Sequence, residues 1–268
     1  MRTPAHRRLR RAAVIALAGS ALLLAGPAGP ALAAPKVTAV NGSALGYWAD
    51  NISLFGGAQP DTGPTPSVTL ASNASNSPQA ASTTTGLVQY GPATLFSSDG
   101  ISVNSSGATG PSGFATSSTS ITNVNKAATQ PNTGSEIFTA DGVASTCSAT
   151  ISGLTRSTSI TNGTLQTDSG WDDGDLVYPE PAAAAGGTDE HDPVVVTIPS
   201  SPAPNTTYTG HIHLSGTSVD SWQAVFNEHV TNGNGSSTVN ALHEYFIGPI
   251  LLGHMSLGRS TCGVTARG

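Results

Sequence analysis

The apolar residues of this chain fall in short runs, and glycine, proline, asparagine and serine separate one run from the next. Few stretches could sustain a helix of ten residues, and several runs alternate apolar with polar positions as half-buried strands do. The pattern predicts an all-β fold, an antiparallel β-sandwich-like domain with long Ser/Thr/Gly/Asn-rich loops. We expect strands at 37–40, 44–55, 66–70, 86–98, 101–103, 119–125, 135–151, 158–167, 193–199, 207–216, 222–231, 237–248 and 253–262.

The clearest local structure is a hairpin near the C-terminal end. The segments 222–231 and 237–248 are dense in β-forming residues, and "NGNGS" between them tolerates positive φ. We expect a turn or short loop at "GPILLG" and a last strand that ends at Cys262. Segments 71–85 and 104–113 carry too few apolar groups to offset the entropy of ordering, so we predict mobile loops there.

The hexapeptide "STSITN" occurs twice, at 118–123 and at 157–162. A β-solenoid needs at least three stacked repeats, and the sequence shows no third copy. The sequence therefore favours the sandwich and leaves the β-solenoid as the alternative. Coincidence in a chain so rich in serine and threonine also stays open as an explanation of the repeat.

Residues 1–33 have the order of a secretory signal peptide: a basic start, an apolar middle and a small-residue end, "ALA". The apolar stretch is interrupted by Gly19 and closed by Gly26-Pro27, so it is shorter than the roughly 20 residues of a membrane-spanning helix. We expect cleavage after Ala33. The export route would be either the general or the twin-arginine one. Residues 34–268 are then predicted to form a single β-rich domain, secreted, extracellular or associated with the cell surface.

Removal of the signal segment makes the chain strongly acidic. Five basic residues remain against sixteen acidic ones, a formal net charge of −11. Binding to a nucleic acid duplex needs a basic stripe that replaces counterions, so we expect no nucleic acid partner, and anionic membrane surfaces are poor partners as well. Leu, Ile, Val and Phe make up 45 of the 235 remaining residues, about a fifth, which predicts a lean core.

The chain has two cysteines, Cys147 and Cys262, in the similar local frames "STCSAT" and "STCGVT". Export sends them to an oxidising compartment, so we predict that they form a disulfide. The closed loop would span about 115 residues, and chain entropy gives about 4.7 kcal/mol for a loop near 100 residues. Residues 179–193 have the composition of a linker, and the bridge would join the parts of the chain before and after it into one folded unit.

A histidine pair, His211 and His213, lies in the alternating run "TYTGHIHLSG". Alternate residues of a strand share one face about 6 to 7 Å apart, which suits two ligands of one transition metal. The third ligand would come from His191, His229, His243, His254 or acids near them. The alternatives are a metal-dependent extracellular enzyme that uses this strand and, more simply, a polar pair on the solvent face of a strand.

Eight of the sixteen acids lie between 168 and 192, and "DSGWDDGD" groups Asp168, Asp172, Asp173 and Asp175. Calcium favours such clustered oxygens, although the spacing is not that of an EF-hand. A calcium-binding surface module is thus one possibility, and calcium is the one cofactor that the sequence suggests. The other possibility is a solvated acidic loop or linker over about 168–193.

Sequence templates for catalysis are not met. "HEYFI" (243–247) opens like a zinc-protease motif, but Ile247 stands where the second histidine is required. The serine of "GHMSLG" is one place too far from the first glycine to form a nucleophile elbow. We therefore expect no enzymatic activity.

The ordered segments "ADNISLFGG", "GPTPSVTL", "STCSATISGLTRSTSITNGTL", "NTTYTG", "VFNEHVTNGNGSSTVNALHEYFIGP" and "LGRSTCG" resemble the choice-of-anchor P family of secreted actinobacterial proteins. The resemblance covers most of the chain after residue 33. It implies an extracellular or cell-surface β-rich domain whose members differ in how they attach to the cell, and it transfers no functional site. The ending "CGVTARG" has neither a sortase-type motif nor a hydrophobic tail, which argues against covalent or transmembrane anchoring. We expect a structural or adhesive role, with cell-wall or surface components as partners.

Overall fold

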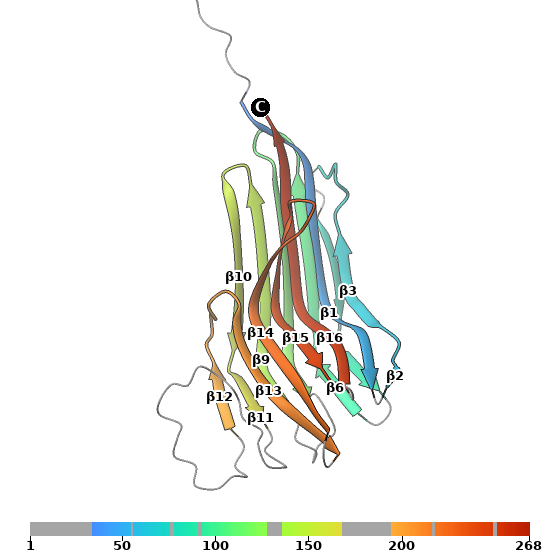
Figure 1. Ribbon diagram of the computed structural model, residues 1–268. Helices are drawn as coiled ribbons and strands as arrows, with labels where there is room; N and C mark the ends of the chain where they lie inside the picture. Colours follow the sequence, from blue (N-terminus) through green and yellow to red (C-terminus); the bar gives the residue numbers. More distant parts are fainter. Residues whose placement is uncertain are drawn as a thin grey trace, which may run out of the picture. The chain divides into compact units, whose positions relative to one another are not determined.

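Two antiparallel sheets packed face to face make up the fold (Figure 1). The computed structural model describes residues 34–54, 56–75, 78–90, 93–127, 136–167, 194–215, 218–248 and 251–268, with the backbone alone at 211–215, 218–220 and several strand ends. All long regular elements in these ranges are β-strands, and none of these residues belongs to a helix that could span a bilayer. The predicted sandwich-like fold is confirmed, and the solenoid alternative is wrong.

Sheet A contains the C-terminal strands of the chain together with its first strands. Its order is β13 (Thr206–Ser215), β14 (Ser218–Thr231), β15 (Ser237–Ile247), β16 (Leu251–Arg267), β1 (Lys36–Leu54) and β2 (Gly57–Ala58), and β3 (Thr62–Thr69) also pairs with β1. The predicted hairpin is confirmed as β14–β15, in which Thr231 pairs with Ser237. The last strand begins earlier and continues beyond Cys262, because β1 offers partners as far as Lys36, which pairs with Arg267.

Sheet B contains the middle of the chain. Its order is β12 (Val194–Ile198), β11 (Gly163–Thr167), β9 (Glu136–Thr150), β8 (Phe114–Ala127), β6 (Ala93–Ser98) and β5 (Gly86–Tyr90); β10 (Gly153–Thr161) pairs with β9, and β7 (Ile101–Ala108) pairs with β8 and with β4 (Gln79–Thr83). The single strands expected at 86–98 and 158–167 are each divided in two.

The loops predicted at 71–85 and 104–113 are wrong in part, because each contains strand. β4 lies in the first, and β7 continues through the first half of the second with alternate residues buried. Ser105 and Gly107 occupy inward positions of β7, and the Ser105 hydroxyl lies 2.7 Å from that of Ser117 on β8. A count of apolar residues misses such a strand, since its buried side chains are small and satisfy each other by hydrogen bonds.

The two copies of "STSITN" flank the same strand. Residues 118–123 and 157–162 pair with opposite edges of β9 in equivalent registers, so that the first serine of each copy lies opposite Thr146. Both copies end at an asparagine with positive φ, 50° at Asn123 and 51° at Asn162. Asparagine tolerates this conformation better than most residues. The repeat thus marks where two neighbours of β9 bend at the same level.

These bends change which residues face the interior. In sheet A, the positive-φ residues Asn227 (φ 51°) of β14 and Gly258 (φ 63°) of β16 lie at the same level on the two sides of β15. Met255 and Leu257 face the interior before Gly258, whereas Ser260 and Cys262 face it afterwards, so the alternation shifts by one residue at the glycine. On the C-terminal side of the bend, Arg259 therefore lies on the outer face.

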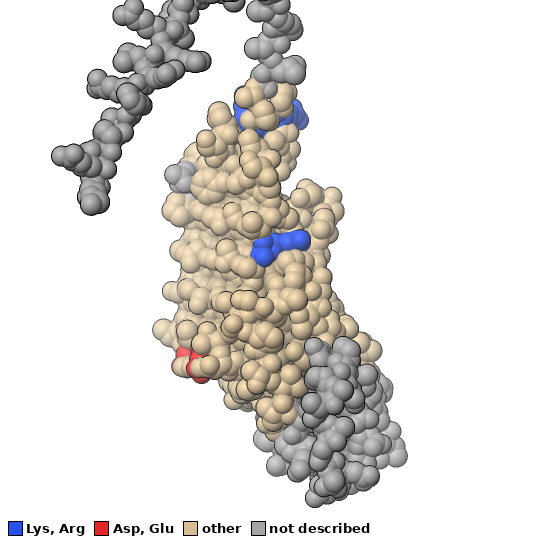
Figure 2. All heavy atoms as spheres, turned by 90° about the vertical axis from the view of Figure 1, so that its left-hand side faces the viewer, with Lys and Arg blue, Asp and Glu red and all other residues tan. Residues whose placement is uncertain are grey.

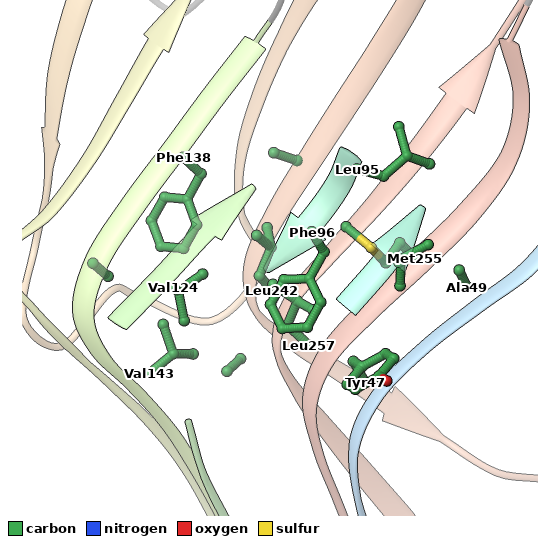
Figure 3. Packing of buried hydrophobic residues seen from close by; sticks show 14 of the residues in the cluster. Tyr47, Ala49, Leu95, Phe96, Val124, Phe138, Val143, Leu242, Met255 and Leu257 are labelled. Carbon is green, nitrogen blue, oxygen red and sulfur yellow. The ribbon is translucent and has the colours of Figure 1, made fainter. Parts of the chain in front are cut away.

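One half of the interior is a cluster of large apolar side chains (Figure 3). Aromatic rings from the two sheets meet there: the centroids of Tyr47 and Phe96 lie 5.0 Å apart, and those of Phe138 and Phe226 lie 5.2 Å apart. Tilted and edge-on ring pairs of this kind contribute about 0.5–1.5 kcal/mol beyond area burial. This half holds most of the bulky residues of a chain that has few.

The other half is built from small side chains around the disulfide. Cys147 of β9 and Cys262 of β16 are joined, with Cα atoms 5.5 Å apart and neither residue exposed. The predicted disulfide is confirmed, and it connects the two sheets. Beside it the hydroxyls of Ser145 and Ser260 lie 2.7 Å apart across the same interface.

A buried ion pair, which the sequence did not predict, also connects the sheets. The Lys126 ammonium of β8 contacts the Glu244 carboxylate of β15, and both side chains have zero exposure. The Lys126 Nζ lies 5.5 Å from the ring centroid of Phe246. Burial of two charges is costly, and removal of one partner from such a pair typically costs about 3–5 kcal/mol.

Replacement of both cysteines with alanine should lower the free energy of unfolding by up to about 4.7 kcal/mol, because the unfolded chain without the cross-link regains the entropy of a long open loop. Denaturant unfolding of the two proteins measures the difference. Intact mass should rise by about two units on reduction of the wild-type chain, as two thiols form. Alkylation of both cysteines in the native, unreduced protein would contradict the bridge.

Lys126→Met should destabilise the protein by about 3–5 kcal/mol near neutral pH, since it leaves the Glu244 carboxylate buried without its ammonium. The double variant Lys126→Met with Glu244→Leu removes both charges and should regain most of the loss. Denaturant unfolding of both variants provides the comparison. An equal loss in the single and double variants would mean that packing, rather than the unpaired charge, sets the cost.

Candidate functional site

The histidines predicted to bind a transition metal lie in β13, where His211 pairs with Ser221 and His213 with Val219. They occupy alternate positions of a strand, as expected, but their side chains lie outside the described part of the structure. The metal site at this pair stays a prediction. The calcium candidates Asp168, Asp172, Asp173 and Asp175, with the linker at 168–193, also lie outside the described residues, so calcium binding stays a prediction as well.

The candidate third ligands that the structure describes make contacts of their own. His229 Nε2 lies 3.1 Å from Asn227 Oδ1, and burial together with the nearby Arg156 lowers the pKa of His229. His243 and His254 belong to a separate cluster described below, and His191 lies outside the described ranges. Among the residues that the structure describes, no three His, Cys, Asp or Glu side chains form a metal-binding group.

A polar network covers part of the outer face of sheet A. Its members are Trp48, Asp50, Glu228, Asn240, His243, Tyr245, His254 and Arg259. The Glu228 carboxylate is its centre: it accepts hydrogen bonds from Asn240 Nδ2 at 2.5 Å and Tyr245 Oη at 2.7 Å, and His243 Nδ1 lies 2.7 Å away. Three groups from one strand, β15, thus hold a single carboxylate of β14.

Two histidines connect this carboxylate to a second one. His243 Nε2 lies 3.2 Å from His254 Nδ1, and His254 Nε2 lies 3.5 Å from Asp50 Oδ2. Two neutral imidazoles carry two ring protons, one for the contact with Glu228 and one for the contact between the rings. A third proton would place a positive charge on the pair and turn the longer contact with Asp50 into an ion pair.

Arg259 and Trp48 form the other side of the network. Arg259 Nε donates to Asn240 Oδ1 at 2.9 Å, and the guanidinium carbon lies 5.5 Å from the Trp48 ring centroid. A cation over an indole face contributes about 0.5–1 kcal/mol at exposed sites and more where it is desolvated. The amide of Asn240 therefore orients a cation with its oxygen and an anion with its nitrogen.

The register of the β14–β15 hairpin brings Glu228 and Asn240 of the network together. The turn at 232–236 sets Thr231 opposite Ser237, and counting back from it places Glu228 opposite Asn240. That part of the network could have been predicted from the sequence by counting from the turn. The positions of Asp50 and His254 could not, because they depend on how β1 and β16 align.

The charges of the network follow from its contacts. Burial raises the pKa of Glu228, but the hydrogen bond and the charge interaction with His243, together with hydrogen bonds from Tyr245 and Asn240, outweigh it and bring the value to about 2. Burial and the Glu228 carboxylate raise the pKa of Tyr245, so its phenol stays protonated. Burial and the neighbouring His243 lower the pKa of His254 despite Asp50. At neutral pH the network holds Glu228 as a fixed anion.

Comparisons of this chain with protein-family models, with curated proteins and with solved structures found no match. The geometry and chemistry of the chain itself therefore carry the assignment of function.

Glu228→Gln should remove one part of the acid sensitivity of the protein. A carboxyl whose folded pKa of about 2 lies below its usual 4.5 adds stability above pH 4.5, and this is lost as the pH falls towards 2. The difference in unfolding free energy between wild type and variant should therefore shrink as the pH falls from 4.5 to 2. Asp61→Asn, a change outside the network, is the control for general acid effects. A difference that stays constant from pH 5 to pH 2 would contradict the assigned role of Glu228.

Proposed function

We propose that the chain is a secreted or cell-surface protein with a structural or adhesive role and no catalytic activity. The observation that carries the proposal is the buried disulfide between Cys147 and Cys262, which ties one sheet to the other. Disulfides form and persist in oxidising compartments outside the cytosol. The signal-like residues 1–33 and the resemblance to the choice-of-anchor P family favour the same location.

The position of the disulfide suits a protein that bears mechanical load. Strands β1 and β16 run antiparallel, with Lys36 opposite Arg267, so both ends of the folded part leave sheet A side by side (Figure 1). A pull on the C-terminal end acts first on β16, where Cys262 lies close to Arg267. The covalent bond passes this load to β9 in the other sheet, whereas the backbone hydrogen bonds of β16 connect it to strands of sheet A.

The surface chemistry suits adhesion through neutral hydrogen-bonding groups. On the face shown in Figure 2, charged side chains are few among a large majority of uncharged ones. The network on sheet A adds oriented side chains, and groups already held in place lose little entropy when they bind a ligand. Glu228, with a pKa near 2, is poorly matched to general base catalysis near neutral pH, which favours binding over turnover.

Retention on cell walls tests the proposal. Residues 34–268, purified with the disulfide intact, should sediment with isolated actinobacterial cell walls, whereas an unrelated disulfide-bonded protein of similar charge should stay in solution. The same preparation should contain no stoichiometric zinc, copper or iron. Complete recovery in the supernatant would contradict adhesion to the wall. A stoichiometric metal that is lost in His211→Gln with His213→Gln would instead favour the metal-dependent enzyme.

A further inference from the structure

An open groove of about 310 Å³ lies on the outer face of sheet A, beside the polar network. Its lining comes from β1, β14, β15, β16 and the turn between β14 and β15: Asn41, Ser43, Leu45, Val230, Asn232, Asn234, Ser236, Thr238, Arg259 and Thr261. The volume is at the lower end of the range for small-molecule sites, about 300–1,000 Å³.

The β14–β15 turn forms one wall because it lies over β16. A Cβ atom at Gly263 would lie 2.8 Å from the Cα atom of Ser236, so glycine is required for the turn to approach the strand this closely. Asn232 Nδ2 donates to Ser236 Oγ at 2.8 Å and to Thr238 Oγ1 at 3.0 Å, which fixes the wall to the strand that follows it. The groove is therefore a built feature of the hairpin.

The lining chemistry is that of a polyhydroxylated ligand. Within the described residues, the Asn41 amide, the Ser43 hydroxyl and the Arg259 Nη atoms make no hydrogen bond to protein, so they are available to a ligand. Amides offer a donor and an acceptor together, as sugar hydroxyls require. Leu45 and Val230 add apolar contact for the carbon face of a sugar ring.

Arg259 makes the groove positive at one point. It is the cationic residue among the described lining residues, and none of them is acidic. Its Nε atom is occupied by Asn240 and its plane lies near Trp48, so the guanidinium is held in place with its Nη atoms available. Guanidinium groups bind carboxylates through paired, charge-assisted hydrogen bonds.

We propose that this groove binds a saccharide unit that carries a carboxylate, such as a uronic acid residue of a surface glycan. The inference rests on the proposed adhesive function and names its ligand class. The carboxylate pairs with Arg259, the ring hydroxyls bind Asn41, Ser43 and the asparagine-rich turn, and the carbon face of the ring packs on Leu45 and Val230.

Three small ligands separate this proposal from simpler ones. The first is p-nitrophenyl β-D-glucuronide, the second is the matching glucoside, which has a hydroxymethyl group in place of the carboxylate, and the third is cyclohexanecarboxylate, which has a ring and a carboxylate but no hydroxyls. NMR titration of residues 34–268 with each ligand gives Kd. The glucuronide should bind at least about tenfold more tightly than either of the others, since loss of a hydrogen bond to a charged group costs about that factor.

Two variants locate the binding. Arg259→Gln removes the cation and should weaken glucuronide binding at least about tenfold, with little effect on the glucoside. Ser43→Trp fills the groove without altering Arg259 and should abolish binding of both sugars. Leu252→Trp, at an exposed position of β16 outside the groove, is the matched control and should bind as wild type does. Thermal unfolding shows whether each variant is folded.

The outcomes distinguish the ligand proposal from the adhesive function. Equal binding of glucuronide and glucoside overturns the role of the carboxylate, and tightest binding of cyclohexanecarboxylate reduces the groove to a simple anion site. Glucuronide binding that survives Ser43→Trp in a folded protein overturns the groove. If wild type and Ser43→Trp both sediment with cell walls, the adhesive function stands while the groove proposal fails. If neither walls nor sugars bind, both fail.

Discussion

The bond between Cys147 and Cys262 is the constraint on which this sandwich depends, because it fastens the sheets where the interior has the least apolar material. Around it lie small residues and hydroxyl pairs such as Ser145 with Ser260. Small side chains bury little apolar area, so burial alone stabilises this half weakly. The covalent link compensates by limiting the unfolded chain, and it leaves the aromatic cluster to stabilise the other half.

Strand β15 connects the interior with the outer face. His243 and Tyr245 point outward to Glu228, while Glu244 between them points inward to Lys126 of the opposite sheet. Strand alternation produces this division without any special loop. A shift of β15 by one residue would bury two polar side chains and expose Glu244, so the ion pair and the network together oppose a change of register.

The network and the groove share Arg259, which gives the network a role in positioning. Asn240 holds both Arg259 and Glu228, and Glu228 in turn is held by His243 and Tyr245. The orientation of the Arg259 guanidinium in the groove thus depends on side chains that do not line it. A binding face built in this way is rigid, and it needs no enclosed pocket to be selective.

The sequence by itself determined the all-β class, the β14–β15 hairpin and the disulfide, because these follow from local alternation, turn residues and the presence of two cysteines. It did not reveal the strand in 104–113, since buried Ser105 and Gly107 look like loop residues until a facing strand supplies their partners. Tertiary structure alone decided that Lys126 meets Glu244 and that His254 meets Asp50. These contacts join residues distant in the chain, and their positions depend on the alignment of β8 with β15 across the interior and of β1 with β16 within sheet A. No local pattern encodes such alignments, because they are set by the packing of the whole sandwich.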